Sequence, residues 1–330
     1  MKLIISGIGV VGRALLNFLK NDKRFIVCGI VKSDGALYNP DGLNLKYLHI
    51  KSSSSLKEHA NWHDSMTTTD IISEAECNCL VELTPTNLDT GQPATENIIT
   101  AIETGMDVVS ANKAPFALYY KKIFSLADET QRLVKYEATV GGAVPSIDIK
   151  KYFFLNDNLE YIKGILNGTT NFILHTMETS KVELRLAIEE AKARGYTEKD
   201  PSQDISGMDA AAKAVILANT FFDTDITIKQ AKIIGIDRIS YEAIELASEE
   251  GKVIKQIAFT DGNTVEVSPY LIEQTDSLNV SGNLNAIKYK YSSSGEITLI
   301  GKGAGGVPTA ATVYSNIISI YNSRRKIETP

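Results

Sequence analysis

The stretch that decides the fold is KLIISGIGVVGRALLNFL, which runs from Lys2 to Leu19. Its apolar start, Lys2 to Ser6, predicts a short buried strand, and helical spacing follows from Val11 to Lys20. Between them lies Gly7-Ile8-Gly9-Val10-Val11-Gly12. The first glycine permits a tight turn, the second lets the backbone approach a pyrophosphate, and the third lets helix and strand pack closely. This order of elements predicts a dinucleotide-binding site, and a glycine-rich turn without a ligand is the alternative.

The end of the second predicted strand bears on the choice of coenzyme. Phe25 to Val31 predicts that strand, and Lys32-Ser33-Asp34 follows it. Sites that prefer NAD place an acid here to bind the ribose, whereas a basic side chain accommodates the 2′-phosphate of NADP. Because Lys32 occupies this position, the sequence favours NADP over NAD; the alternative is a solvated Lys32 with Asp34 on the ribose. Thr84, which follows an apolar run, is a further candidate cofactor contact.

The rest of the chain divides into two parts with different patterns. Alternating strands and helices predict an α/β fold over residues 1–136, a Rossmann-type doubly wound parallel sheet with a long crossover at 35–65. Helical spacing from Phe172 to Arg194 and from Met208 to Phe222 then precedes strands joined by tight turns between residues 253 and 300. We therefore expect an α+β substrate-binding and dimerisation domain with antiparallel strands at 137–305. A last helix within 306–330 is expected to complete the first domain.

Length and composition limit the class of protein. At roughly 150 residues per domain, 330 residues suggest two domains. A net charge of -6 without a long basic run argues against nucleic acid as a partner, and no apolar run is long enough for a membrane span. The N-terminus has no signal-peptide pattern, and Cys28, Cys77 and Cys79 lie on apolar segments, as reduced core thiols do. A cytoplasmic protein is therefore expected.

Further segments resemble homoserine dehydrogenases and occur in the order of that family. They are Ser110 to Lys113, Tyr136 to Gly142, Gly164 to Asn171, Gly195 to Pro201, Asp204 to Lys213, and Gly303 to Gly305. The resemblance covers nearly the whole chain, and its most specific part runs from Gly195 to Lys213. It implies NAD(P)-dependent interconversion of L-homoserine and L-aspartate 4-semialdehyde, on the route to threonine and methionine. It also implies a short form without a C-terminal regulatory domain.

Asp209 and Lys213 are the strongest candidates for catalysis. They are four residues apart, so they share one face of a helix whose other residues are mostly small or apolar. A charged pair is costly to bury unless it is well paired or used. An ordinary helix salt bridge is the alternative. The resemblance implies that Lys213 transfers the proton at the substrate oxygen and that Asp209 orients Lys213 or the substrate hydroxyl.

The resemblance also implies how the substrate is held. It places Glu198 and Asp204 against the substrate ammonium, where charge-assisted hydrogen bonds are strong. A solvated turn is the alternative for Glu198. Lys113 follows a predicted strand and is expected to contact both substrate and cofactor, or to share the proton transfer. The strands between 253 and 300 have nothing else in the chain to cover them, so a homodimer through this sheet is expected, as the resemblance also implies.

Two glycine-rich segments complete the candidate site. Glu137 to Val144 resembles the family's loop for a monovalent cation, Na⁺ or K⁺. Its candidate ligands are the Glu137 side chain and the carbonyls of Val140, Gly142 and Val144, and a hinge between domains is the alternative. Gly303-Ala304-Gly305 resembles a backbone contact to the nicotinamide half of the cofactor, and a plain turn into the last helix is the alternative.

Three other functions are compatible with parts of this pattern. Aspartate-semialdehyde dehydrogenase shares the metabolite but needs an acylating cysteine, and every cysteine here lies within the first 79 residues. A non-catalytic NAD(P) sensor has no need for Glu198, Asp209 and Lys213 together. An oxidoreductase of similar layout for a sugar or another amino acid is the third alternative.

Overall fold

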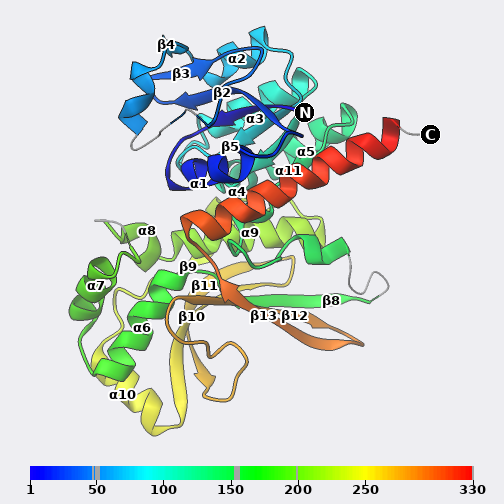
Figure 1. The fold of residues 1–330 in the computed structure, drawn as a ribbon. Helices are drawn as coiled ribbons and strands as arrows, with labels where there is room; N and C mark the ends of the chain where they lie inside the picture. The colour runs from blue at the N-terminus through cyan, green and yellow to red at the C-terminus, as the bar shows by residue number, and fades with distance from the viewer. Residues whose placement is uncertain (47, 49–52, 152–156, 198–199, 329–330) are drawn as a thin grey trace. The chain divides into compact units, whose positions relative to one another are not determined.

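The computed structural model describes residues 1–46, 48, 53–151, 157–197 and 200–328 (Figure 1). The chain divides into two compact units, Met1–Gly142 with Gly305–Pro330 and Ala143–Ala304. The first unit is therefore discontinuous in sequence, and its last part is helix α11 (Gly306–Glu328). Among the helices of the described residues, none combines the length and apolar character that a bilayer crossing needs.

The first unit is built on a seven-stranded sheet in the order β4-β3-β2-β1-β5-β6-β7. Its strands are β1 (Lys2–Ser6), β2 (Ile26–Lys32), β3 (Gly35–Tyr38), β4 (Trp62–Asp64), β5 (Cys79–Glu82), β6 (Asp107–Ser110) and β7 (Val134–Lys135). Its other helices are α1 (Val10–Leu19), η1 (Ser53–Glu58), α2 (Thr68–Glu74), α3 (Ala94–Glu103), α4 (Ala114–Leu118), α5 (Tyr120–Glu129) and η2 (Glu137–Thr139). In the order of the sheet, the neighbouring strands β2, β1, β5, β6 and β7 are parallel. The predicted Rossmann-like α/β class is therefore confirmed.

The edge of this sheet differs from the prediction of a parallel sheet with a crossover at residues 35–65. Strand β3 is antiparallel to β2, and β4 is antiparallel to β3, so the sheet is mixed. Lys32 pairs with Gly35, and the two residues left for the turn can join only antiparallel strands. Gly35 has a φ of +147°, and a Cβ there would lie 2.4 Å from the backbone oxygen of His63. Glycine is therefore required where the chain turns back.

Helix α11 packs into the core of the first unit. Its side chains in this core are Ala310, Val313, Ile317 and Ile320, each 0% exposed and clustered with residues of β1 and α1. Near the end of the helix, Arg324 Nε donates to Asp107 Oδ2 at 2.8 Å, and a second guanidinium nitrogen donates to the other carboxylate oxygen. Full burial of an isoleucine side chain contributes about 1.5–3 kcal/mol. The helix is thus an integral part of this unit.

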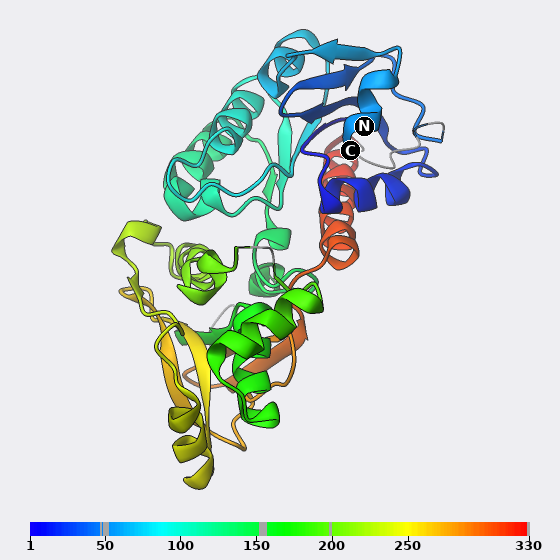
Figure 2. The same ribbon diagram turned by 90° about the vertical axis from the view of Figure 1, so that its left-hand side faces the viewer.

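The second unit is built on a six-stranded sheet in the order β13-β12-β8-β10-β11-β9. Its strands are β8 (Leu159–Ile165), β9 (Lys232–Ile233), β10 (Lys252–Thr260), β11 (Val265–Glu273), β12 (Leu284–Tyr291) and β13 (Gly295–Lys302). Its helices are η3 (Asp148–Lys151), α6 (Gly168–Ser180), α7 (Leu184–Ala193), α8 (Ser202–Ile205), α9 (Met208–Phe222), η4 (Ile228–Gln230) and α10 (Tyr241–Glu249). The predicted antiparallel pairing is confirmed from β13 to β11, and only the short β9 is parallel to its neighbour. Helices α6, α9 and α10 all contact β10 (Figures 1 and 2).

Candidate functional site

The glycine-rich turn after β1 has the geometry of a phosphate-binding turn. Gly7 has a φ of +99° and donates its N–H to the Val31 carbonyl at 2.9 Å. A Cβ on Gly7 would lie 2.5 Å from the Leu83 backbone, and one on Gly12 would lie 2.4 Å from the Gly7 oxygen. A Cβ on Gly9 would meet no described atom within 4 Å, and Gly9 caps α1 without a side-chain hydrogen bond. The uncapped first turn of α1 and the space at Gly9 fit a dinucleotide pyrophosphate.

The first turns of α1 and α11 lie side by side within the first unit. The other residues of the glycine-rich turn are Ile8, Val10 and Val11. Ile8 is buried, whereas Val10 is the first residue of α1 and is 64% exposed. A Cβ on Gly306, the first residue of α11, would lie 2.3 Å from Val10 Cγ1. Two helix N-termini, each with unpaired N–H groups and a positive dipole end, therefore face the same region.

Lys32 lies in a small charged cluster at the end of β2. Its ammonium is 2.7 Å from Asp34 Oδ1, and the Lys57 ammonium is 2.9 Å from Asp34 Oδ2. Hydrogen bonds from Lys32 and then Lys57 hold the pKa of Asp34 at about 2. Both ammonium groups also lie over the Trp62 ring, at 5.5 and 5.8 Å from its centroid. Lys57 and Trp62 could not be assigned to this cluster from sequence, because both are distant from Lys32 in the chain.

Thr84 is held by a buried carboxylate next to the glycine-rich turn. Glu82, at the end of β5, is 0% exposed and accepts the Thr84 N–H at 2.7 Å as well as its hydroxyl. Asn97 Nδ2 donates to the other Glu82 oxygen at 2.8 Å, and Asn112 Nδ2 donates to the Thr84 carbonyl at 2.9 Å. Burial raises the pKa of Glu82. Since a Cβ on Gly7 would lie 2.7 Å from the Thr84 nitrogen, this network fixes one wall of the turn.

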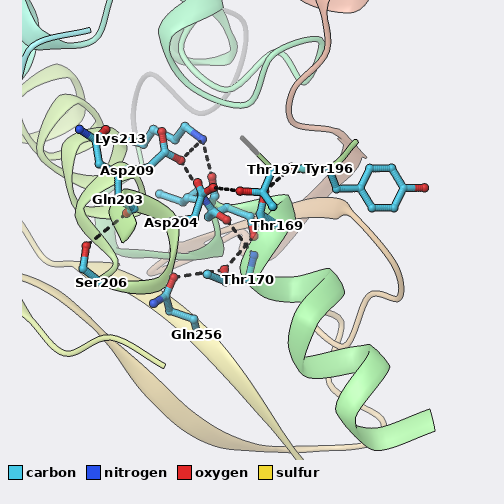
Figure 3. Close-up of polar contacts among 12 residues, drawn as sticks. Thr169, Thr170, Tyr196, Thr197, Gln203, Asp204, Ser206, Asp209, Lys213 and Gln256 are labelled. Carbon is cyan, nitrogen blue, oxygen red and sulfur yellow. Dashed lines mark hydrogen bonds and ion pairs between the residues drawn. The ribbon is translucent and has the colours of Figure 1, made fainter. Parts of the chain in front are cut away.

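The candidate catalytic pair lies at the buried start of α9 (Figure 3). Lys213 is 7% exposed among alanines, and its ammonium donates to Asp209 Oδ2 and to the Leu166 carbonyl, each at 2.7 Å. These two bonds use two of the three N–H groups of an ammonium. The third has no acceptor among the described residues, which leaves it available to a substrate oxygen.

Asp204 joins the same cluster from the short helix α8 (Figure 3). Asn167 Nδ2 donates to Asp204 Oδ1 at 2.6 Å and to Asp209 Oδ2 at 2.8 Å. Thr197 donates its hydroxyl to the other Asp204 oxygen at 3.3 Å. Burial, and then the charge of Asp209, raise the pKa of Asp204. The structure thus brings together Asp204, Asp209 and Lys213 and adds Asn167, which the sequence analysis did not single out.

The remaining candidate residues belong to other segments of the chain. Glu198 lies outside the described residues. Lys113 is half-buried between β6 and α4, where it is the N-cap residue. Of the cation-loop candidates, Glu137, Val140 and Gly142 belong to the first unit and Val144 to the second. The described residues contain no group of three or more His, Cys, Asp or Glu arranged to hold a metal ion.

Gly303 and Ala304 end the second unit, and Gly305 begins the last part of the first. Gly303 stacks on the Asn285 side chain so closely that a Cβ would lie 2.0 Å from Asn285 Cγ. Gly305 has a φ of +122°. Gly303 is therefore required by its close approach to the buried Asn285 side chain, and Gly305 by its left-handed backbone.

Comparison with known proteins agrees with this arrangement. A family model for "Homoserine dehydrogenase, NAD binding domain" matches residues 7–137, and one for "Homoserine dehydrogenase" matches residues 145–318. A homoserine dehydrogenase of Methanocaldococcus jannaschii is 39% identical, with 99% of this chain and 100% of the relative covered. One of Sulfurisphaera tokodaii is 35% identical, with 96% and 98% covered.

A solved structure leads to the same family. A hyperthermophilic archaeal homoserine dehydrogenase in complex with NADPH has a TM-score of 0.85 and 28% identity, with 100% of this chain and 98% of that chain covered. The resemblance drawn from the sequence motifs is confirmed. The chain belongs to the homoserine dehydrogenase family and has its NAD(P)-dependent activity on homoserine.

Proposed function

We propose that Lys213 moves the proton at the substrate oxygen and that Asp209 holds it in place. The observation that carries this proposal is the buried ammonium with two fixed N–H groups and a third that no described residue accepts. In the reductive direction, Lys213 donates a proton to the aldehyde oxygen; in the oxidative direction, its neutral amine accepts the hydroxyl proton. The bound coenzyme supplies or accepts the hydride. Turnover of Lys213→Ala against Lys113→Ala tests the assignment.

Two acids and a lysine around this pair bind the substrate in the proposed mechanism. Glu198 and Asp204 bind the substrate ammonium, and Asp209 also faces the substrate. The fixed orientation of the Asp204 carboxylate, with one oxygen on Asn167 and one on Thr197, supports its part in this role. Lys113 contacts substrate and coenzyme, or shares the proton transfer. The substrate pair is L-homoserine and L-aspartate 4-semialdehyde, on the route to threonine and methionine.

The backbone of the two helix starts supports our proposal for the coenzyme site. We assign the pyrophosphate to the turn from Gly7 to Gly12, with Thr84 beside it, and the nicotinamide half to Gly303, Ala304 and Gly305. We further propose that NADP is preferred over NAD. Lys32 supports this preference, because its ammonium stands at the end of β2, where a 2′-phosphate would offer it a second negative partner besides Asp34.

Lys32→Ala should weaken NADP binding about ten- to a hundredfold and change NAD binding little. The reason is that a hydrogen bond between charged groups contributes about 1.5–3 kcal/mol. Fluorescence titration with NADPH and NADH measures both dissociation constants. Lys121→Ala, which removes an exposed lysine from α5 of the same unit, is the charge-matched control. Equal weakening of both coenzymes by Lys32→Ala would contradict the preference.

A monovalent cation, Na⁺ or K⁺, is also part of the proposal. Its ligands are the Glu137 carboxylate and the carbonyls of Val140, Gly142 and Val144. The support is chemical: Glu137 is only 5% exposed, and alkali cations prefer such hard oxygen donors. Gly141 and Gly142 have φ values of +74° and +57°, so the backbone curls at this point, as a ring of carbonyl ligands requires.

One face of the sheet in the second unit supports a homodimer. The Phe221 ring of α9 lies 5.3 Å from the Tyr289 ring, so α9 covers the face that carries Tyr289. Lys288 and Lys163 are paired neighbours on the opposite face. There the Lys163 ammonium lies 4.9 Å from the Tyr161 ring centroid, and Ile300 is 53% exposed. Contact with a second copy of the chain would remove the Ile300 side chain from water, which favours burial of this face.

We therefore propose a homodimer through this face. Light scattering at micromolar concentration should give a mass near twice the 36.0 kDa of one chain. A monomeric mass would contradict the proposal. We also place the enzyme in the cytoplasm, which the three free cysteines, Cys28, Cys77 and Cys79, support.

A further inference from the structure

The junction between β8 and α6 contacts all three charged side chains of the Lys213 cluster, which consists of Asp204, Asp209 and Lys213. The Leu166 carbonyl accepts from Lys213 at 2.7 Å. The next residue, Asn167, is 4% exposed and donates from one amide nitrogen to Asp204 at 2.6 Å and to Asp209 at 2.8 Å. The two carboxylates belong to different helices, α8 and α9. A single amide therefore links both helices and both acids.

The orientation of this amide is fixed by the start of α6. Asn167 is the N-cap residue, and its Oδ1 accepts the backbone N–H of Thr170 at 2.8 Å. A backbone nitrogen can only donate, so the amide atom that faces it must be oxygen and the nitrogen must face the carboxylates. The two hydrogens of the amide match the two carboxylate oxygens. Capping the helix and binding the acids are thus two separate tasks of one side chain.

The cluster has more negative than positive groups. The described groups that face Asp204 are Asp209, Lys213, Asn167 and Thr197. Burial and the charge of Asp209 raise the pKa of Asp204, and the hydrogen bonds from Asn167 and Thr197 oppose that rise. Two carboxylates this close repel each other, and a donor placed between them offsets the repulsion. Without the amide, we expect Asp204 to take up a proton more easily and Asp209 to leave its position beside Lys213.

We propose that Asn167 is a positioning residue, which holds the carboxylates of Asp204 and Asp209 in the orientation that the reaction needs around Lys213. This inference rests on the proposed role of Lys213 and adds the group that keeps its partners in place. Asn167 itself does not exchange a proton, since an amide does not titrate in the working range of pH.

Asn167→Ser separates the two tasks, because serine caps a helix about as well as asparagine but has no amide nitrogen. We expect kcat/KM to fall about ten- to a hundredfold, the size of a lost hydrogen bond to a charged group. The acid limb of the pH profile should move to higher pH, since Asp204 loses a donor. The dissociation constant for NADPH should stay close to that of the parent enzyme. The melting temperature should fall by only the few degrees that the two lost hydrogen bonds cost.

Asn167→Asp provides a second variant with a good cap. It puts a third carboxylate against Asp204 and Asp209, so activity should fall further at neutral pH. As the pH is lowered, the new carboxyl gains a proton and can donate again, so activity relative to the parent should partly recover. If Asn167→Ser does not fold, this recovery decides the question by itself: its absence would overturn the proposal.

Ser240→Ala is the matched control for loss of a cap alone. Ser240 caps α10 by accepting the Ala243 N–H at 3.3 Å, and among the described residues it makes no hydrogen bond with Asp204, Asp209 or Lys213. It should lower the melting temperature and leave the pH profile unchanged. An Asn167→Ser enzyme with parental kcat/KM and pH profile overturns the positioning role. If Lys213→Ala turns over normally, the proton assignment fails instead, so the two failures are distinguishable.

Discussion

Lys213→Ala should lower kcat by about 10²–10⁴, the span usual for loss of a general acid–base group. The substrate oxygen would lose the lysine to which we assign the proton transfer. The glycine-rich turn of the other unit, and with it coenzyme affinity, should change little. Asp209 and the Leu166 carbonyl each lose a hydrogen bond, which costs about 1–3 kcal/mol. That is too little to unfold a domain of ordinary stability. Steady-state kinetics, with a thermal melt on the same sample, measures both effects.

Two further variants separate the assignments for Lys213. Lys213→Arg should restore little activity, because arginine stays protonated at any working pH and cannot accept the hydroxyl proton. If the pair were only a helix salt bridge, Lys213→Ala would keep near-normal kcat and lose a few tenths of a kcal/mol of stability. If Lys113→Ala abolishes turnover and Lys213→Ala does not, the proton belongs to Lys113.

Gly7→Ala should destabilise the first unit by about 2–5 kcal/mol and weaken coenzyme binding with it. A left-handed backbone costs a non-glycine residue about 1–2 kcal/mol, and Gly7 has a φ of +99°. The new methyl would also lie 2.5 Å from the Leu83 backbone, and crowding of this kind costs a further 1–3 kcal/mol or so. Denaturant unfolding gives the loss of stability, and titration with NADPH gives the loss of affinity.

Gly9→Ala is the matched control two residues away. A Cβ at Gly9 meets no described atom within 4 Å, and its φ of -71° suits alanine. The unfolding free energy should therefore stay near that of the parent enzyme. The methyl would occupy the space assigned to the pyrophosphate, so the affinity for NADPH should still fall. Unchanged affinity in a well-folded Gly9→Ala enzyme would contradict the assignment of this turn.

The parts of the fold that the sequence predicted are those that local patterns determine. The strand, turn and helix at the N-terminus follow from adjacent residues, and the later strands follow from tight turns between apolar runs. The prediction of helical structure from Phe172 to Arg194 was only partly right. Two helices are present, because α6 ends at Ser180 and Lys181 adopts a left-handed conformation, with a φ of +53°. Periodicity alone does not indicate this break. The pattern Ser180-x-x-Glu183 predicts a capping box at a helix start here, and a helix does start nearby, but its N-cap is Glu183 and not Ser180.

The candidate site shows the same division between local and distant information. Asp209 and Lys213 could be paired from sequence because they share one helix. Asn167 donates to Asp209, which lies 42 positions away in the chain. Glu82 lies in a strand whose other residues are all apolar. No periodic pattern marks such residues, since their partners are set by how strands and helices pack.

The return of α11 to the first unit affects the order in which the nascent chain can fold. The core formed by β1 and α1 lacks Ile317 and Ile320 until the ribosome has made the 162 residues from Ala143 to Ala304 (304 − 143 + 1) and then the helix itself. At about 5–20 residues per second, the intervening stretch takes roughly 8–30 s to synthesise. The second unit is contiguous, so it can complete its core first. A chaperone that binds exposed apolar surface would therefore find it on the N-terminal part of this chain until α11 has been synthesised.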